Sequence, residues 1–593
     1  MRSSDEHSSL AANRHGLCYK RGALDRNPAN TTMWTHNYQP LGGSLALSAP
    51  VAALPIVVLF LMLGVWRAPA WKAALSALAT AFVLSILLYG MPAQLAVISA
   101  LYGAAYGLFP IAWIVFSSIM LYRLAVDTGK FEIIKDSVGS LTDDRRLQAM
   151  LIAFSFGAFI EGAAGFGAPV AVSGAMLAGL GFNPFYAAGI CLIANTAPVA
   201  FGSIGIPVTT LAAVTGLPVL PLSAMVGRMC ALVSIIIPGY LIVVMAGWAR
   251  AMEVLPAIIA CGVSFAGMQF FVSNYMGPEL TDILSSLTCI VVMVAVLKLW
   301  KPSRIMRLEG DAPITVAAKR HSAGEIFMAW VPYLLLVAFV LPWGEPSIKA
   351  QIDRFTHGIM PGFLPKAAAG LNGVEVWGLH NAITRIPPVT SAPAPYAAIF
   401  AFNWLSASGT ACFLATIAAA LVLRVSPGRF VGLYTATFNQ LKFAILTIAL
   451  MLGLAQLMNY SGMTSTLGLA LATTGVLFPF FSAVVGWLGV FLTGSDTSAN
   501  ALFGNLQVVT ANALGLNPIL TASVNSAAGV MGKMISVQSI AVAVAATGMT
   551  SDDESRLFRF TIKHSVMLMI VMGLVAMLYA YVFPGWVPVV PPK

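Results

Sequence analysis

Long apolar runs recur along almost the whole chain and limit what it can fold into. Hydrophobic residues make up 59% of the 593 residues and charged residues only 9%, against about a quarter charged in an average soluble protein. An α-helix needs roughly 20 apolar residues to cross a bilayer. The runs are too long and too continuous for outer-membrane strands. The sequence therefore predicts an all-α polytopic membrane protein of about 12 to 14 transmembrane helices.

Charged residues gather in the loops between these runs. The net charge is +10, but the basic residues are scattered over short loops, which does not fit a nucleic-acid surface. Two loops, at 123–146 and 298–320, are especially basic, and the positive-inside rule predicts that both face the cytoplasm. The six cysteines show no paired spacing. We expect buried thiols, without a disulfide set, a metal site or a haem attachment.

The two halves of the chain carry similar glycine-rich motifs, each with one acidic residue. Glu161 lies in FGAFIEGAAGFGAPVA and Asp496 in LGVFLTGSDTSANALF. The first motif is followed by GFNP and the second by GLNP, and then by an asparagine seven residues before a glycine, Asn195 and Asn525 respectively. We therefore predict an internal repeat with re-entrant or broken helices, an arrangement common in transporters.

These features divide the chain into four parts. Residues 1–32 are polar and lack the apolar core of a secretory signal, so we expect a disordered N-terminal extension, with Met33 as an alternative start. The other parts are a first transmembrane half (33–297, with a repeat motif at 156–207), a basic cytoplasmic loop (298–325) and a second transmembrane half (326–593, with a repeat motif at 488–541).

Small and hydroxyl-bearing residues in the motifs favour interrupted helices inside the membrane. Helix N-termini attract anions, so four breaks around one midplane cavity would form an anion site, with Asn195 and Asn525 marking two of them. The alternative is that the small residues only allow close helix packing, which does not explain the acids. The candidate substrate-binding residues are Gly162, Gly165, Asn195, Thr196, Thr493, Gly494, Ser495, Thr497, Ser498, Asn525, Ser526 and Lys533.

Glu161 and Asp496 are the candidate proton-coupling residues. A carboxylate at bilayer depth costs kilocalories unless it is paired, hydrated or protonated, so it is kept mainly where a pathway needs it. Histidine is nearly absent from the predicted spans, which leaves carboxyls to exchange protons. The alternatives are a structural pair with a lysine and, for Asp496, a helix cap. Four other acids at span edges are interpreted as interfacial: Glu253, Glu279, Asp282 and Glu325.

Several stretches are long and specific, among them EGAAGFGAPVA (161–171), NTAPVAFG (195–202), GWLGVFLTGSDTSANALF (486–503) and GKMISVQSIA (532–541). They resemble stretches of the bacterial L-lactate permease family, and the resemblance runs from MWTHNYQP (33–40) to the last span. It implies a transporter in the bacterial cell (inner) membrane that takes up L-lactate, D-lactate and glycolate with protons. It also implies inverted repeats with re-entrant hairpins, often working by an elevator-type motion. The polar extension before Met33 departs from the family pattern.

A 2-hydroxymonocarboxylate needs a cation or a cluster of N–H donors for its carboxylate. Few basic residues lie within or near the predicted spans: Arg228, Lys442 and Lys533. Lys533 follows Asn525 by eight residues, close to an expected helix break, and is the first choice. For all three the alternative is a side chain that reaches out to the membrane surface.

Other functional classes find less support in the sequence. An integral-membrane enzyme would need a constellation such as HExxH, CxxCH or a Walker loop, and the chain has none of these. We therefore expect no catalytic residue, no cofactor and no metal. The expected partners are a small monocarboxylate, H⁺ and the lipid bilayer, with no nucleic acid. A sodium-coupled carrier of small organic anions is the nearer alternative, since hydroxyls and backbone carbonyls in the hairpins could bind Na⁺.

Overall fold

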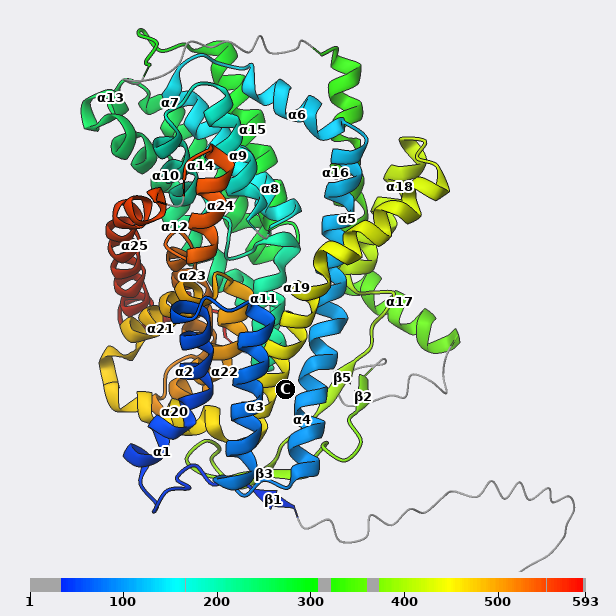
Figure 1. Ribbon diagram of the computed structural model, residues 1–593, viewed down its shortest axis with the longest axis vertical. Coiled ribbons are helices and arrows are strands. Elements are labelled where there is room, and N and C mark those ends of the chain that lie inside the picture. The colour runs from blue at the N-terminus through cyan, green and yellow to red at the C-terminus, as the bar shows by residue number, and fades with distance from the viewer. Residues whose placement is uncertain (1–32, 166, 308–320, 360–372, 551, 590–593) are drawn as a thin grey trace, which may run out of the picture.

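The computed structural model describes residues 33–165, 167–307, 321–359, 373–550 and 552–589. The predicted N-terminal extension, 1–32, lies outside the described residues, as do residues 308–320 of the basic loop. Helices make up most of the described chain (Figure 1).

The helices of the first half are α1 (Leu45–Ala52), α2 (Leu54–Phe60), α3 (Ala70–Leu87), α4 (Ala93–Tyr106), α5 (Trp113–Asp127), α6 (Lys130–Gly139), α7 (Arg145–Gln148), α8 (Gly157–Ala163), α9 (Ala168–Gly179), α10 (Pro184–Ala194), α11 (Ile206–Thr215), α12 (Val219–Ala246), α13 (Trp248–Met252), α14 (Leu255–Tyr275) and α15 (Thr281–Leu299). A π-helical stretch, Ala149–Phe156, joins α7 to α8.

The helices of the second half are α16 (Ala323–Gly344), α17 (Pro346–Ile359), α18 (Ser408–Val422), α19 (Pro427–Ser461), α20 (Met463–Leu471), α21 (Phe478–Thr493), α22 (Asp496–Leu514), α23 (Pro518–Lys533), α24 (Val537–Thr547) and α25 (Asp553–Met577). Short strands form two small sheets. In the first, β3 (Ile383–Arg385) pairs in parallel with β1 (Trp34–Thr35) and antiparallel with β4 (Ala394–Pro395). In the second, β2 (Gly373–Glu375) pairs antiparallel with β5 (Ile399–Ala401).

The prediction of a polytopic helical membrane protein is confirmed. Among the described residues, eleven helical segments are long and apolar enough to cross a membrane, and four shorter apolar helices accompany them. Large apolar side chains such as Leu87 and Leu299 are 75% and 88% exposed, as expected for surfaces that face lipid. The described cysteines are all free and buried, which matches the expectation of buried thiols.

Each half contains two interrupted helical segments, in the same order along the chain. In the first half α8 ends at Ala163 and α9 begins at Ala168, and a break at 195–205 separates α10 from α11. In the second half the turn at 494–495 separates α21 from α22, and a break at 534–536 separates α23 from α24. The glycine-rich motifs therefore interrupt helices, as the sequence predicts.

The matching GFNP and GLNP strings begin matching helices. Asn183 precedes α10, and its side chain accepts a hydrogen bond from the Phe185 N–H at 3.0 Å. Asn517 precedes α23 and accepts from the Ile519 N–H at 2.8 Å. Both asparagines satisfy an N–H group that the first turn of a helix leaves free, and a proline follows each as the first helical residue.

The expected helix break at Asn525 is wrong. Asn195 does end α10, but Asn525 lies inside α23, which continues to Lys533. The amide of Asn525 is satisfied by another helix, since it donates to Asn500 Oδ1 at 2.9 Å and accepts from Gln507 Nε2 at 3.1 Å. With those partners it has no need to compete for the backbone of its own helix.

The first basic loop, 123–146, and the described part of the second, 298–307, meet at one end of the molecule, the upper end in Figure 1, near α7 and α13. Arg146 is buried there and pairs with Asp144 at 2.8 Å and with Glu253 at 2.7 Å. Its guanidinium also donates to the carbonyl of Arg304, in the second basic loop, at 2.8 Å. These contacts anchor the segment that leads into α8, and they place the first basic loop and residues 298–307 of the second on the same side of the bundle.

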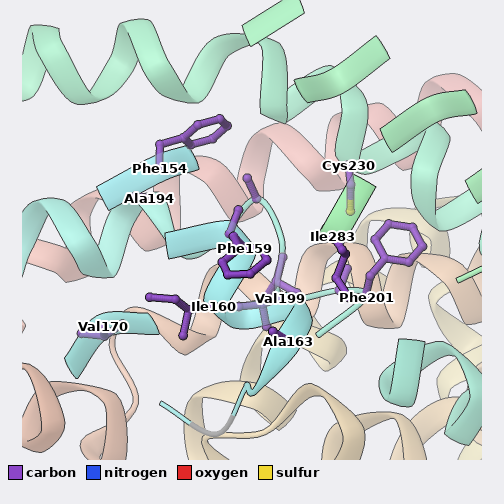
Figure 2. Close-up of a cluster of buried hydrophobic side chains, with 14 of the residues drawn as sticks. Phe154, Phe159, Ile160, Ala163, Val170, Ala194, Val199, Phe201, Cys230 and Ile283 are labelled. Atoms are coloured by element: carbon purple, nitrogen blue, oxygen red, sulfur yellow. The ribbon is translucent and has the colours of Figure 1, made fainter. Parts of the chain in front are cut away.

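Apolar side chains surround the breaks of the first half. Figure 2 shows Phe159 of α8 and Val199 and Phe201 of the α10–α11 break close to Ile283 of α15. These residues belong to a large core that includes side chains from both halves of the chain. A second core contains side chains of the first four helices, α1, α2, α3 and α4, and of α19, α20 and α22. The non-helical backbone is therefore held in packed protein, away from lipid, as a membrane protein requires.

Candidate functional site

A cavity of about 620 Å³ lies where the four helix breaks meet. The first half contributes residues of the α8–α9 and α10–α11 breaks, among them Gly165 and Ser203. The second half contributes the turn before α22 and the residues that flank the α23–α24 break. Side chains of α3 and α19 line another part of it, where Trp71 and Phe443 stack with ring centroids 5.8 Å apart.

One ion pair joins the two halves of the chain at this cavity. Lys533 Nζ lies 3.1 Å from Glu161 Oε1, and the two side chains are 11% and 3% exposed. Lys533 is the last residue of α23, where the helix dipole favours a positive charge. Glu161 lies in the last turn of α8, where the dipole disfavours a negative one. Its other oxygen, Oε2, has no hydrogen-bond partner among the described residues.

Asp496 lines the same cavity but is held differently. It is the first residue of α22 and is 3% exposed. Its Oδ2 accepts hydrogen bonds from Ser526 Oγ at 2.6 Å and from Asn500 Nδ2 at 3.2 Å. The helix cap is Ser495, which accepts from the Ser498 N–H at 3.2 Å. The alternative that Asp496 caps the half-helix is therefore wrong, although the N-terminus of α22 still stabilises a negative charge there.

The candidate site residues fall into two groups by position. Those that line the cavity are Glu161, Gly165, Thr493, Gly494, Ser495, Asp496, Thr497, Ser498 and Lys533. Those that lie outside its lining are Gly162, Asn195, Thr196, Asn525 and Ser526. Ser526 still acts on the site through Asp496, whereas Thr196 donates to the carbonyl of Ile193 at 2.7 Å. What each residue binds stays a prediction.

Gly162 serves helix packing. A Cβ at this position would lie 2.8 Å from Cβ of Asp282, closer than atoms can approach, so only glycine lets α8 and α15 meet here. Gly165 and Gly494 differ, because they line the cavity and have φ of +61° and +69°, which glycine adopts without strain. Close packing thus accounts for Gly162, and a left-handed backbone accounts for Gly165 and Gly494, although a Cβ at Gly494 would also lie 2.7 Å from Gln538 Oε1.

The two other candidate cations lie away from the cavity. Arg228 donates to Asn274 Oδ1 at 2.8 Å and to the carbonyl of Trp586. Lys442 is exposed on α19, with its ammonium 5.5 Å from the centre of the Phe443 ring. Of the described residues that line the cavity, Lys533 alone is basic.

Sequence reasoning missed several residues around the site. Gln538 and Ser539 line the cavity at the start of α24, and their place in the GKMISVQSIA stretch was the signal that could have pointed to them. Asp282, interpreted as interfacial, is instead 2% exposed. Trp71 and Phe443 carry no sequence signal, because aromatic residues are common in every span.

Known proteins similar to this chain share most of its length. The profile of the family described as L-lactate permease matches residues 48–583. The L-lactate permease of Bacillus subtilis (strain 168) is 48% identical over 564 residues, covering 94% of this chain and 100% of that protein. The chain belongs to the L-lactate permease family. It is accordingly a multi-pass membrane transporter of the bacterial inner membrane, and no enzyme.

Two further members of the L-lactate permease family show the range of names among its relatives. Glycolate permease GlcA of Escherichia coli (strain K12) is 46% identical over 566 residues, covering 93% of this chain and 99% of that protein. The L-lactate permease of the same strain is 44% identical over 561 residues, covering 94% of this chain and 100% of that protein. The breaks and the cavity all lie inside the matched region.

Proposed function

We propose that this protein is a secondary active transporter that takes up L-lactate, D-lactate and glycolate together with protons across the plasma membrane. The names of its relatives, lactate permease and glycolate permease, support the substrate class. The observation that carries the proposal is the buried Lys533–Glu161 pair, because it lines a cavity to which both halves of the chain contribute.

The cavity offers a partner for each part of a 2-hydroxymonocarboxylate. The substrate carboxylate binds Lys533 through a charge-assisted hydrogen bond, in place of the Glu161 carboxylate. Hydroxyls and free N–H groups of the turn at 493–498 bind the substrate hydroxyl, close to the N-terminus of α22. Apolar side chains such as Ile206 and Val542 contact the small substituent.

Charge balance in the cavity supports coupling to protons. Lys533 neutralises one carboxylate, so a bound substrate anion leaves Glu161 as an unpaired buried charge. Such a charge costs several kilocalories per mole, and protonation of Glu161 removes it. One substrate anion therefore enters with one proton, and the loaded site has the same net charge as the empty one.

Glu161 is the first choice for the coupled proton, and Asp496 the second. The C-terminal end of α8 disfavours a charge on Glu161 once Lys533 has left it. Asp496 keeps two hydrogen-bond donors and the N-terminus of α22 in either state. A proton is thus gained more readily by Glu161.

Sodium coupling is the second candidate function. One observation favours it. Asp496 Oδ1 has no hydrogen-bond partner among the described residues, and the same turn contains Thr493 Oγ1 and the Ser495 carbonyl, which contact one another. Oxygen atoms of this kind could bind Na⁺. In that case Asp496 would stay charged and Glu161 would be a structural partner of Lys533.

The two candidates differ in the gradient that drives uptake. In proteoliposomes with an imposed pH gradient and no Na⁺, we expect concentrative uptake of L-lactate and glycolate, because Glu161 carries the proton. Collapse of the gradient with a protonophore should abolish it. Accumulation that survives the protonophore and follows an imposed Na⁺ gradient would show that the sodium-coupled alternative is right.

Lys533→Ala tests the substrate carboxylate site. We expect affinity for L-lactate to fall by about 2–5 kcal/mol, the usual loss when one partner of a buried charge pair is truncated, measured by calorimetry on purified protein. Lys442→Ala is the control, since it removes an exposed cation from α19.

A second variant separates binding from folding. Lys533→Ala leaves Glu161 buried and unpaired, which lowers stability, whereas Lys533→Ala combined with Glu161→Gln leaves no charge there. The double variant should recover thermal stability in detergent without recovering L-lactate binding. Wild-type affinity in the Lys533→Ala protein would mean that the substrate binds elsewhere.

Glu161→Gln tests proton coupling with little change in volume. We expect pH-driven accumulation of L-lactate to be lost while exchange of labelled for unlabelled L-lactate is kept, because exchange needs no net proton release. Asp496→Asn is the matched variant from the second half, and its loss of coupling should be smaller. Wild-type accumulation and pH dependence in Glu161→Gln would remove Glu161 from the mechanism.

A further inference from the structure

A third carboxyl lies behind the cavity, on α15. Asp282 is the second residue of this helix and is 2% exposed. Neither of its carboxyl oxygens has a hydrogen-bond partner among the described residues. Buried polar groups are almost always hydrogen-bonded, and an unpaired buried carboxylate is strongly destabilising. The geometry therefore favours the neutral acid at Asp282, and its oxygens are unused for hydrogen bonding among the described residues.

An unused acceptor on the facing helix belongs to Glu161. Asp282 packs directly against Gly162, the chain neighbour of Glu161. It is also close enough to Glu161 and Lys533 for their charges to act on it. Oε1 of Glu161 accepts a hydrogen bond from Lys533. The second oxygen, Oε2, is buried and has no hydrogen-bond partner among the described residues. Two carboxyls with unsatisfied oxygens thus lie on facing helices, α8 and α15.

Other titratable groups around Asp282 are few. Cys230 of α12 lies within electrostatic range of both Asp282 and Asp496. On the neighbouring α14 the titratable group that faces α15 is Cys261, which contacts Cys289 two turns further along the helix. Cys261 and Cys289 are buried and contact one another, and Cys230 is buried as well. On the facing helix α8, the titratable neighbour of Asp282 among the described residues is Glu161.

We propose that Asp282 is a proton-relay residue. When the substrate carboxylate binds Lys533, Asp282 replaces Lys533 as the partner of the Glu161 carboxylate. Glu161 then turns its carboxylate from Lys533 to Asp282. The O–H bond of Asp282 breaks and an O–H bond of Glu161 forms, so the negative charge moves to Asp282. The transported proton next enters from the cavity and neutralises the pair. The two carboxyls together hold one proton before substrate binding and two after it.

Helix polarity gives this transfer its direction. Glu161 is near the C-terminus of α8, where a negative charge is disfavoured, and Asp282 is in the first turn of α15, where it is favoured. The helix ends therefore stabilise a transient negative charge on Asp282 more than one on Glu161. Asp282 lies outside the cavity lining, so it acts through Glu161 and does not touch the substrate.

The inference rests on the proposed proton coupling through Glu161, and the experiment separates the two. Asp282→Asn, Glu161→Gln and wild type are compared in proteoliposomes for pH-driven L-lactate uptake and for exchange across a range of pH. In Asp282→Asn we expect uptake to slow by about a hundredfold, the lower end of what a positioned proton donor contributes, because Asn can still donate a hydrogen bond to Glu161 but has no proton to transfer. The pH profile of exchange should move, with L-lactate affinity kept within a few-fold.

Glu279→Gln is the matched control. Glu279 lies three residues before Asp282 and accepts from Ser408 Oγ at 3.1 Å, away from the cavity lining. It should behave as wild type. A wild-type uptake rate and pH profile in Asp282→Asn, with Glu161→Gln defective, would overturn the relay and leave the proposed function intact. Wild-type accumulation in Glu161→Gln would overturn the proposed function itself.

Gly162→Ala changes the contact between α8 and Asp282 by a substitution on α8. A Cβ at position 162 would lie 2.8 Å from Cβ of Asp282 and must push that side chain away. If Asp282→Asn fails to fold, Gly162→Ala should reproduce the slow uptake and the displaced pH profile. A folded Gly162→Ala protein with wild-type uptake and pH profile would equally overturn the relay.

Discussion

Lys533 faces more carboxyls than one cation can neutralise, and this charge balance shapes the centre of the protein. Among the described residues, Glu161, Asp282 and Asp496 lie within electrostatic range of this lysine, and all three are buried. Burial makes an unpaired carboxylate costly, so the number of negative charges must follow the number of positive ones. A substrate anion disturbs that balance by one charge, and a proton restores it.

The helix breaks make this balance possible inside a membrane. They place helix ends at the cavity. Each N-terminal end carries a partial positive charge, and each C-terminal end carries a partial negative charge. Asp496 and Asp282 begin helices α22 and α15, Lys533 ends α23, and Glu161 lies in the last turn of α8. The helix ends favour a charge on Asp496, Asp282 and Lys533 and disfavour one on Glu161. Proton exchange at Glu161 therefore follows from the fold as much as from burial.

Much of this arrangement could be predicted from the sequence, and the rest depends on contacts between distant segments. The motif acids, the GFNP and GLNP helix starts and the position of Lys533 are local signals. Asn525 was misplaced at a break because its partners, Asn500 and Gln507, belong to another helix. The sequence predicts an interfacial Asp282 because this residue lies at the edge of a predicted span. In the structure Pro278 packs against Gly205, in the α10–α11 break, so this loop is buried.

The central claim is that a substrate anion and a proton enter the same buried charge cluster together. It can be tested directly with purified protein in a weakly buffered solution that contains a pH indicator. On addition of saturating L-lactate, wild-type protein should take up one proton for each L-lactate bound, and Glu161→Gln should take up far less. Stoichiometric binding of L-lactate by wild type without proton uptake would contradict the claim.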